Sequence, residues 1–330
     1  MTAFSATLQA FFTARLIRQR QASGHTIAAY RDALRLLLTF AAQRTGTPPS
    51  RFEFPDLDAP LVAAFLDHLE HDRANTVRTR NARLAAVHSL YRYAALRHPE
   101  HAGDIARVLA IPPKKSRHTI VTFLTDAETD ALLAAPDRST WTGRRDHALL
   151  LLAVQTGLRV SELTALTCAD LHLGTGPHVS CHGKGRKDRI TPLTPTTVAV
   201  LRHWLAERGG HPTDPLFPAR RGTALSRDAV EHRLTHHARR AAGTCPTLAT
   251  KKVTPHILRH TAAMRLLHAG VDTTVIALWL GHESTATTQI YLHADLALKQ
   301  QALDRTRPSA TPPGRYQPAT DQLLEFLQRL

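Results

Sequence analysis

The sequence predicts a mainly α protein of two domains, the second of which carries a small antiparallel sheet. Apolar residues recur at helical spacing through most of the 330-residue chain. The stretch at 178–193 has a different pattern, with two short extended runs around a Gly-rich, charged turn. A segment at 111–120, "IPPKKSRHTI", combines two prolines with four basic residues, which is typical of an exposed connection between domains.

The first domain, predicted at 1–112, is expected to be helical. The pattern is clearest in "YRDALRLLLTFA", where leucines three and four residues apart share one face. Asp58 and Asn75 are expected to cap two of the helices, because both side chains can accept a hydrogen bond from a free backbone N–H group. The helices of this domain are predicted at 5–21, 25–43, 59–71 and 75–97.

The helix predicted at 75–97 carries basic residues between its apolar positions. Arg78, Arg80 and Arg83 lie near its start, and Lys114 and Lys115 lie in the linker predicted at 113–120. One face of such a helix could pack while another contacts DNA phosphates. The alternative is an Arg-rich face that is only solvated.

The second domain, predicted at 121–306, begins with Thr125 and Glu128, the spacing of a capping box before an apolar helix. A β-hairpin is predicted within 178–193, "HVSCHGKGRKDRITPL". Further helices of this domain are predicted at 194–208, 226–242, 255–268, 273–280 and 285–306.

A tail predicted at 307–330 follows the second domain. Its Pro-rich start "SATPPGRYQPAT" precedes "DQLLEFLQRL", whose leucines form one helical stripe. The sequence leaves open whether this short amphipathic helix docks on its own domain or on a neighbouring protomer.

The charge balance favours a polyanionic partner. Lys and Arg number 42 against 27 Asp and Glu, giving a formal net charge of +15. The excess is shared, with 17 basic against 9 acidic residues in 1–118 and 25 against 18 in the remainder. This pattern favours nucleic acid over a small acidic substrate. Three cysteines, with neither a signal-peptide layout nor a long apolar run, predict a cytoplasmic protein without a disulfide framework or membrane contact.

The stretch "TPHILRHT" at 254–261 concentrates basic groups at the start of a helix. Thr254 is a good N-cap and Pro255 suits the first helical position. His256, Arg259 and His260 then fall within one turn, where free backbone N–H groups attract anions. A phosphate suits this face, although a solvated basic helix end is the alternative for the motif alone.

Four further stretches carry polar residues of the same kind: "TGLRVSEL", "GKGRKDR", "LGHES" and "IYLH". Together with "TPHILRHT" they resemble the catalytic motifs of the tyrosine recombinase, or phage integrase, family, and the resemblance covers nearly the whole chain. It implies a SAM-like helical core-binding domain followed by an α+β catalytic domain. The residues that match the family's catalytic set are Arg159, Lys184, His256, Arg259, His282 and Tyr291.

These residue types suit cleavage of a phosphodiester by a side-chain oxygen. Tyr291 can form a covalent phosphotyrosine that keeps the bond energy for religation. Arg159 and Arg259 present planar donor forks that match two non-bridging oxygens. Glu162, three residues after Arg159, is expected to orient that guanidinium, with a surface salt bridge as the alternative.

The resemblance implies that Lys184 protonates the leaving 5′ oxygen. Lys187 and Arg189 on the same hairpin are expected to contact DNA. Lys187 is the alternative general acid, and phosphate contact is the simpler role for both lysines. His256 and His282 can donate to the phosphate or move the tyrosine proton, since imidazole titrates near neutrality.

His260 is expected to be structural, and no metal or other cofactor is predicted. Cys168, His172, His178, Cys181 and His182 fall within fifteen residues, but their spacing matches no tight zinc motif.

The family resemblance implies a site-specific recombinase of the integrase or transposase type, and we expect it to come from a mobile element. The sequence leaves open whether the reaction is integration, excision, resolution or transposition. The expected partner of the protein is double-stranded DNA with inverted-repeat core sites, bound by a nucleoid-associated homotetramer that passes through a Holliday junction, with accessory recombination proteins. A type IB topoisomerase shares the phosphotyrosine chemistry but acts as a monomer. A catalytically silent DNA-binding protein is the alternative outside enzymes.

Overall fold

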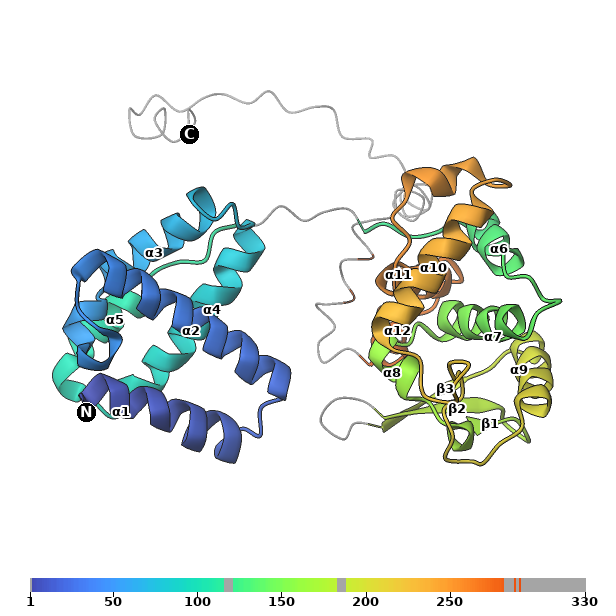
Figure 1. The fold of residues 1–330 in the computed structure, drawn as a ribbon, viewed down its shortest axis with the longest axis horizontal. Coiled ribbons are helices and arrows are strands. Elements are labelled where there is room, and N and C mark those ends of the chain that lie inside the picture. Colours follow the sequence, from blue (N-terminus) through green and yellow to red (C-terminus); the bar gives the residue numbers. More distant parts are fainter. Residues whose placement is uncertain (1, 116–120, 183–187, 282–287, 289–290, 292–330) are drawn as a thin grey trace, which may run out of the picture. The chain divides into compact units, whose positions relative to one another are not determined.

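The computed structural model describes residues 2–115, 121–182, 188–281, Thr288 and Tyr291. The chain divides into two compact units, 1–119 and 120–330, and each unit is considered by itself (Figure 1). The predicted mainly α architecture with a small antiparallel sheet is confirmed. The linker residues 116–120, most of the helix predicted at 285–306 and the tail at 307–330 lie outside the described residues.

The first unit is a helical bundle around α4, which packs against α2, α3 and α5. Its interior is aromatic and aliphatic, with Phe11, Leu37, Phe65 and Leu90 fully or almost fully buried. The helices are α1 (Ala3–Ala10), which continues as a π-helical stretch at Phe11–Gln19, α2 (Gly24–Thr45), α3 (Ala59–His71), α4 (Val77–Ala95) and α5 (Ala102–Leu109).

Most helices of the first unit, and one of the two predicted caps, lie where the sequence predicts them. The Asp58 side chain accepts from the Leu61 N–H group, as predicted for a cap. The cap predicted at Asn75 is wrong by one residue, because the Thr76 hydroxyl accepts from Thr79 N–H instead. The prediction also missed α5, because a run of eight residues is too short for apolar spacing alone to identify a helix.

The second unit packs its helices around α7, which contacts α6, α9 and α11. The capping box of Thr125 and Glu128 at the start of α6 is confirmed. The predicted hairpin is also confirmed, and a two-residue strand that was not predicted pairs with its first strand. The helices are α6 (Asp126–Ala134), α7 (Trp141–Thr156), α8 (Val160–Ala165), α9 (Pro195–Arg208), α10 (Arg227–Ala241), α11 (Pro255–His268) and α12 (Thr273–Leu280).

The sheet has the order β1-β2-β3 and is antiparallel throughout, with β1 at Leu171–His172, β2 at His178–His182 and β3 at Asp188–Pro192. In its register Cys181 lies opposite Arg189. The buried Cys181 and Val179 face the core with Leu171. Among the described residues, no helix is long and apolar enough to cross a membrane.

A buried ionic cluster joins α7 to α10. Asp146 accepts from Arg145 at 2.7 Å and lies 2.9 Å from His237 Nε2, while Arg145 also donates to the Pro218 carbonyl. Buried charges persist only when they are paired in this way. The cluster fixes α10, whose first residue, Arg227, borders the site described next.

Candidate active site

The start of α11 folds as its sequence predicts. The Thr254 hydroxyl accepts from the Ile257 N–H group and Pro255 occupies the first turn. His256 is exposed, whereas Arg259 is only 3% exposed and points into the domain. The rings of His256 and His260 lie 4.2 Å apart, so both imidazoles share one helical face.

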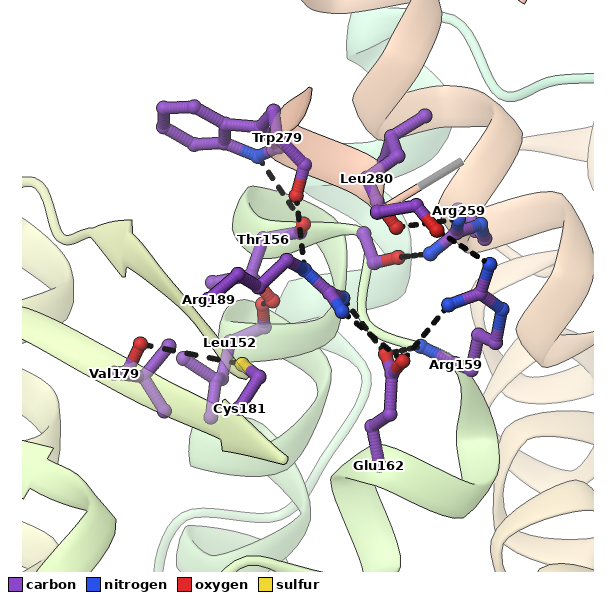
Figure 2. Close-up of polar contacts among 12 residues, drawn as sticks. Leu152, Thr156, Arg159, Glu162, Val179, Cys181, Arg189, Arg259, Trp279 and Leu280 are labelled. Carbon is purple, nitrogen blue, oxygen red and sulfur yellow. Dashed lines mark hydrogen bonds and ion pairs between the residues drawn. The ribbon is translucent and has the colours of Figure 1, made fainter. Parts of the chain in front are cut away.

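The C-terminal end of α12 collects three arginines (Figure 2). Its last two carbonyls accept from Arg189 Nε, at Trp279 (3.1 Å), and from Arg259 Nη2, at Leu280 (2.7 Å). The next carbonyl, that of Gly281, accepts from Arg159 Nη2 at 2.9 Å. The last carbonyls of a helix lack intrahelical partners and carry the negative end of its dipole. This end of α12 is therefore a template that orients guanidinium groups.

Gly281 makes this template possible. Its φ of +65° ends α12 in the left-handed region, the conformation that glycine commonly adopts just after a helix. A Cβ atom there would lie 2.8 Å from Arg189 Nη1. A side chain at this position would displace Arg189 as well as strain the backbone.

Arg259 is held from two sides. Its Nη1 donates to the Gly157 carbonyl at 2.7 Å, in addition to the bond with Leu280. Burial, followed by the nearby charge of Arg159, lowers the pKa of Arg259 to about 10. The guanidinium therefore stays charged at neutral pH, and the two bonds leave further N–H groups for a phosphate.

Glu162 joins the arginines to one another. Its Oε2 accepts from the Arg159 backbone N–H and its Oε1 from Arg159 Nη1, so the predicted contact is present. Arg189 donates to both carboxylate oxygens, at 3.1 and 2.8 Å. Burial alone would raise the pKa of Glu162, but hydrogen bonds from Arg189 and from the Arg159 backbone outweigh it and lower the pKa to about 2.

Arg189 differs from its prediction as a DNA contact. Its side chain is 12% exposed, and its donors are directed at Glu162 and Trp279. Because β3 side chains alternate between faces, the register that buries Cys181 also turns Arg189 toward α8 and α12. Sequence alone could not choose between this inward direction and a DNA-facing one.

A pocket of about 330 Å³ lies beside this network. It is lined by Arg159, His256 and Arg259, so three of the predicted residues meet in one place. Arg227, exposed at the start of α10, also lines it and was not predicted. The only signal for Arg227 was its position directly after the N-cap Ser226.

The Tyr291 side chain is buried. It is 2% exposed and packs with Met264, Ile276 and Leu280. Burial raises the pKa of its hydroxyl, and the charge of Arg259 acts in the opposite direction. The hydroxyl lies 3.0 Å from His260 Nδ1.

The contact between His260 and Tyr291 changes the interpretation of His260, which was expected to be structural. A residue that touches a potential nucleophile is a candidate for the chemistry. Its place one helical turn after His256 was the available signal. Lys184, Lys187 and His282 lie outside the described residues, so their roles stay predictions.

The basic residues predicted to contact DNA in the first unit have different environments. Arg78 and Lys115 are exposed, and Lys114 pairs with Glu70 while its side chain stays half-exposed. Arg83 is partly buried, which lowers its pKa. Their predicted contacts with phosphate remain predictions.

Arg80 departs from the prediction. It is 5% exposed, and its Nη1 donates to Asn81 Oδ1 and to the Pro112 carbonyl. Arg80 therefore fastens the segment before the linker to α4, and its burial leaves it no direct route to a phosphate.

Cysteine and histidine side chains around the hairpin, which were considered as zinc ligands, contact residues of the protein. Cys168 Sγ accepts from Arg208, and the exposed His182 lies between Asp170 and Asp188. Burial raises the pKa of the Cys181 thiol to about 11. In the part of the chain that the structure describes, no group of three or more His, Cys, Asp or Glu side chains could hold a metal ion.

Comparison with known proteins gives consistent matches. The model of the phage integrase family matches residues 122–297, and that of the phage integrase N-terminal SAM-like domain matches residues 10–98. An integrase/recombinase of Sinorhizobium fredii is 56% identical over 98% of this chain and 97% of its own length. Tyrosine recombinase XerC of Pelobacter propionicus is 34% identical over 92% of this chain and 95% of its own.

Solved structures share the fold. The XerH site-specific recombinase bound to a palindromic difH substrate, in a post-cleavage complex, has a TM-score of 0.67 and 22% identity, covering 92% of this chain and 84% of that one. A lambda integrase tetramer bound to a Holliday junction has a TM-score of 0.60 and 19% identity, covering 94% of this chain and 80% of that one.

Proposed function

Because the chain belongs to the phage integrase family of tyrosine recombinases, which transfer DNA strands, we propose that Tyr291 is its nucleophile and that it recombines DNA at specific sites. The observation that carries this proposal is the pocket lined by Arg159, His256 and Arg259. The Tyr291 hydroxyl lies within hydrogen-bond distance of His260, one helical turn after His256. Such a pocket offers two guanidinium forks and an imidazole to one phosphate.

The proposed reaction balances without an external cofactor. The Tyr291 oxygen attacks the phosphorus and loses its proton, the bond from phosphorus to the 5′ oxygen breaks, and a 3′-phosphotyrosine forms. Arg159 and Arg259 stabilise the charge on the non-bridging oxygens. Lys184 gives the departing 5′ oxygen its proton, and His256 and His282 donate hydrogen bonds to the phosphate.

The 3.0 Å separation between His260 and Tyr291 supports a role for His260 in holding the hydroxyl and accepting its proton. In religation the 5′ hydroxyl of the incoming strand attacks the phosphotyrosine, and the same groups act in reverse. The energy of the original phosphodiester is kept in the covalent intermediate, so no ATP is required.

The assembly is also part of the proposal. A tetramer on two inverted-repeat core sites, with a Holliday junction intermediate, is supported by the likeness to the lambda integrase tetramer on such a junction. An origin in a mobile element, help from accessory proteins and a nucleoid location in the cytoplasm are proposed with it. The net charge of +15 supports the DNA partner.

Trapping of the covalent intermediate tests this function. The protein should form a DNA adduct that survives a denaturing gel on a nicked suicide substrate, and mass spectrometry should find the modified tyrosine at position 291. Tyr291→Phe should bind DNA and form no adduct, while the matched Tyr30→Phe change should still form it. An adduct on another residue, or relaxation of supercoiled DNA with no product from two sites, would refute the proposal or favour a topoisomerase.

A further inference from the structure

We propose that Arg189 is a positioning residue for strand cleavage, because it holds Glu162 and, through Glu162, sets the guanidinium of Arg159. This inference rests on the proposed function, in which Arg159 binds the scissile phosphate. It gives Arg189 a role inside the reaction centre in place of the DNA contact that its sequence position suggested.

Arg189 directs three of its five N–H donors at groups of the protein. Nη1 and Nη2 bind the two oxygens of Glu162, and Nε binds the Trp279 carbonyl. Two parallel hydrogen bonds from one guanidinium hold both the position and the orientation of the carboxylate, which a single ammonium could not do. With its side chain 12% exposed, Arg189 has little access to a DNA backbone.

Arg159 needs such support. Its side chain is 42% exposed, and it stands at the N-cap of α8, before the first helical turn fixes the chain. An exposed arginine loses considerable rotamer entropy when one geometry is imposed on it. Glu162 supplies that geometry, since it accepts from both the backbone and the side chain of Arg159.

Without Arg189, the hydrogen bonds that remain to Glu162 among the described residues would come from Arg159, the residue that Glu162 has to orient. Oε1 is shared between Arg159 Nη1 and Arg189 Nη1, so the two arginines hold the carboxylate from opposite sides (Figure 2). One negative charge between two positive charges leaves a net positive site for a phosphate. Arg189 therefore orients the site while Glu162 limits repulsion between the guanidiniums.

The same residue ties three distant segments together. Arg189 lies on β3, Glu162 on α8, and the Trp279 carbonyl at the end of α12. Arg159 donates to the carbonyl of Gly281, the residue just after α12. Both arginines are therefore positioned by the same end of this helix. A shift of β3 by one residue would turn Arg189 to the other face and release Glu162.

A double-mutant cycle tests this chain of contacts. Arg189→Gln, Arg189→Lys, Glu162→Gln and the double Gln variant are compared by single-turnover cleavage at saturating DNA and by the DNA Kd at several salt concentrations. Arg202→Gln is the matched control, because Arg202 also donates to a backbone carbonyl, that of Leu173, at 2.9 Å but lies on α9.

We expect Arg189→Gln to slow cleavage roughly 10- to 100-fold, by analogy with the loss of a partner that orients a metal ligand, with Kd changed less than about threefold. Arg189→Lys should fall between Gln and the wild type. The double variant should be no slower than the slower single variant, because both changes break one pathway. Arg202→Gln should cleave normally.

Other results overturn the inference. If the fold-losses in cleavage rate of the two single variants multiply in the double variant, Arg189 does not act through Glu162. A weaker Kd with a shallower salt dependence would make Arg189 a phosphate contact after all. Unchanged cleavage in Arg189→Gln would remove it from the reaction. Because the wild type and Tyr291→Phe are assayed on the same substrate, absence of any adduct from the wild type would be seen as failure of the proposed function instead.

Discussion

Replacing Arg259 by lysine should separate catalysis from DNA binding. In the folded chain the two Nη atoms of Arg259 each donate to a carbonyl at 2.7 Å, one on Gly157 and one on Leu280. A lysine ammonium keeps the positive charge, but it is a point donor that cannot reach both carbonyls and also present a fork to a phosphate.

The magnitudes follow from these contacts. A lost donor to a charge-developing oxygen costs about 2.7–4 kcal/mol in the transition state, or roughly 100- to 1000-fold in rate. DNA binding should weaken less than about tenfold, because the charge remains and phosphate contacts are spread over many basic groups. A buried carbonyl left without its donor costs about 1–3 kcal/mol of stability, which lowers Tm by several degrees.

The assay compares single-turnover cleavage at saturating DNA with Kd from fluorescence anisotropy, below the variant's unfolding transition. Arg265→Lys is the control on the same helix, since Arg265 is half-exposed and pairs with Asp126 at the surface. Equal losses in cleavage and binding would refute the reasoning and leave Arg259 as a binding residue. A variant that cleaves at the wild-type rate would refute it more directly.

Three further predictions concern the same site. The low pKa of Glu162, about 2 against an ordinary 4.5, stabilises the fold fully above about pH 4.5 and progressively less as pH falls toward 2. Glu162→Gln should therefore lose about 3 kcal/mol in urea unfolding at pH 7, with the difference shrinking in acid; a difference independent of pH would contradict this. His260→Gln should keep DNA binding and slow cleavage roughly 100-fold or more, because an amide can hold the Tyr291 hydroxyl but cannot take its proton; a wild-type rate would return His260 to a structural role. A 5′-phosphorothiolate substrate should restore cleavage to a Lys184→Ala variant, since a thiolate leaves without a proton; rescue of Lys187→Ala instead would move the general acid there.

The sequence by itself determined the local structure around the site. Thr254 and Pro255 start α11, Gly281 ends α12, and Glu162 lies three residues from Arg159, because caps, left-handed glycines and helical neighbours depend only on a few adjacent residues. The pairing of His256 and Arg259 on one face followed from the same periodicity. The family resemblance supplied their role, and the pocket they share agrees with it.

Only the tertiary structure decided which way the remaining polar side chains point. Arg189 and Trp279 are 90 residues apart in the chain, Arg159 and Gly281 are 122 apart, and His260 and Tyr291 are 31 apart. No local pattern encodes such pairs, because an arginine on a strand or helix has the same propensity whether it faces DNA or a carboxylate. Packing of distant helices buries it or exposes it, and the cost of an unpaired buried charge then selects its partner.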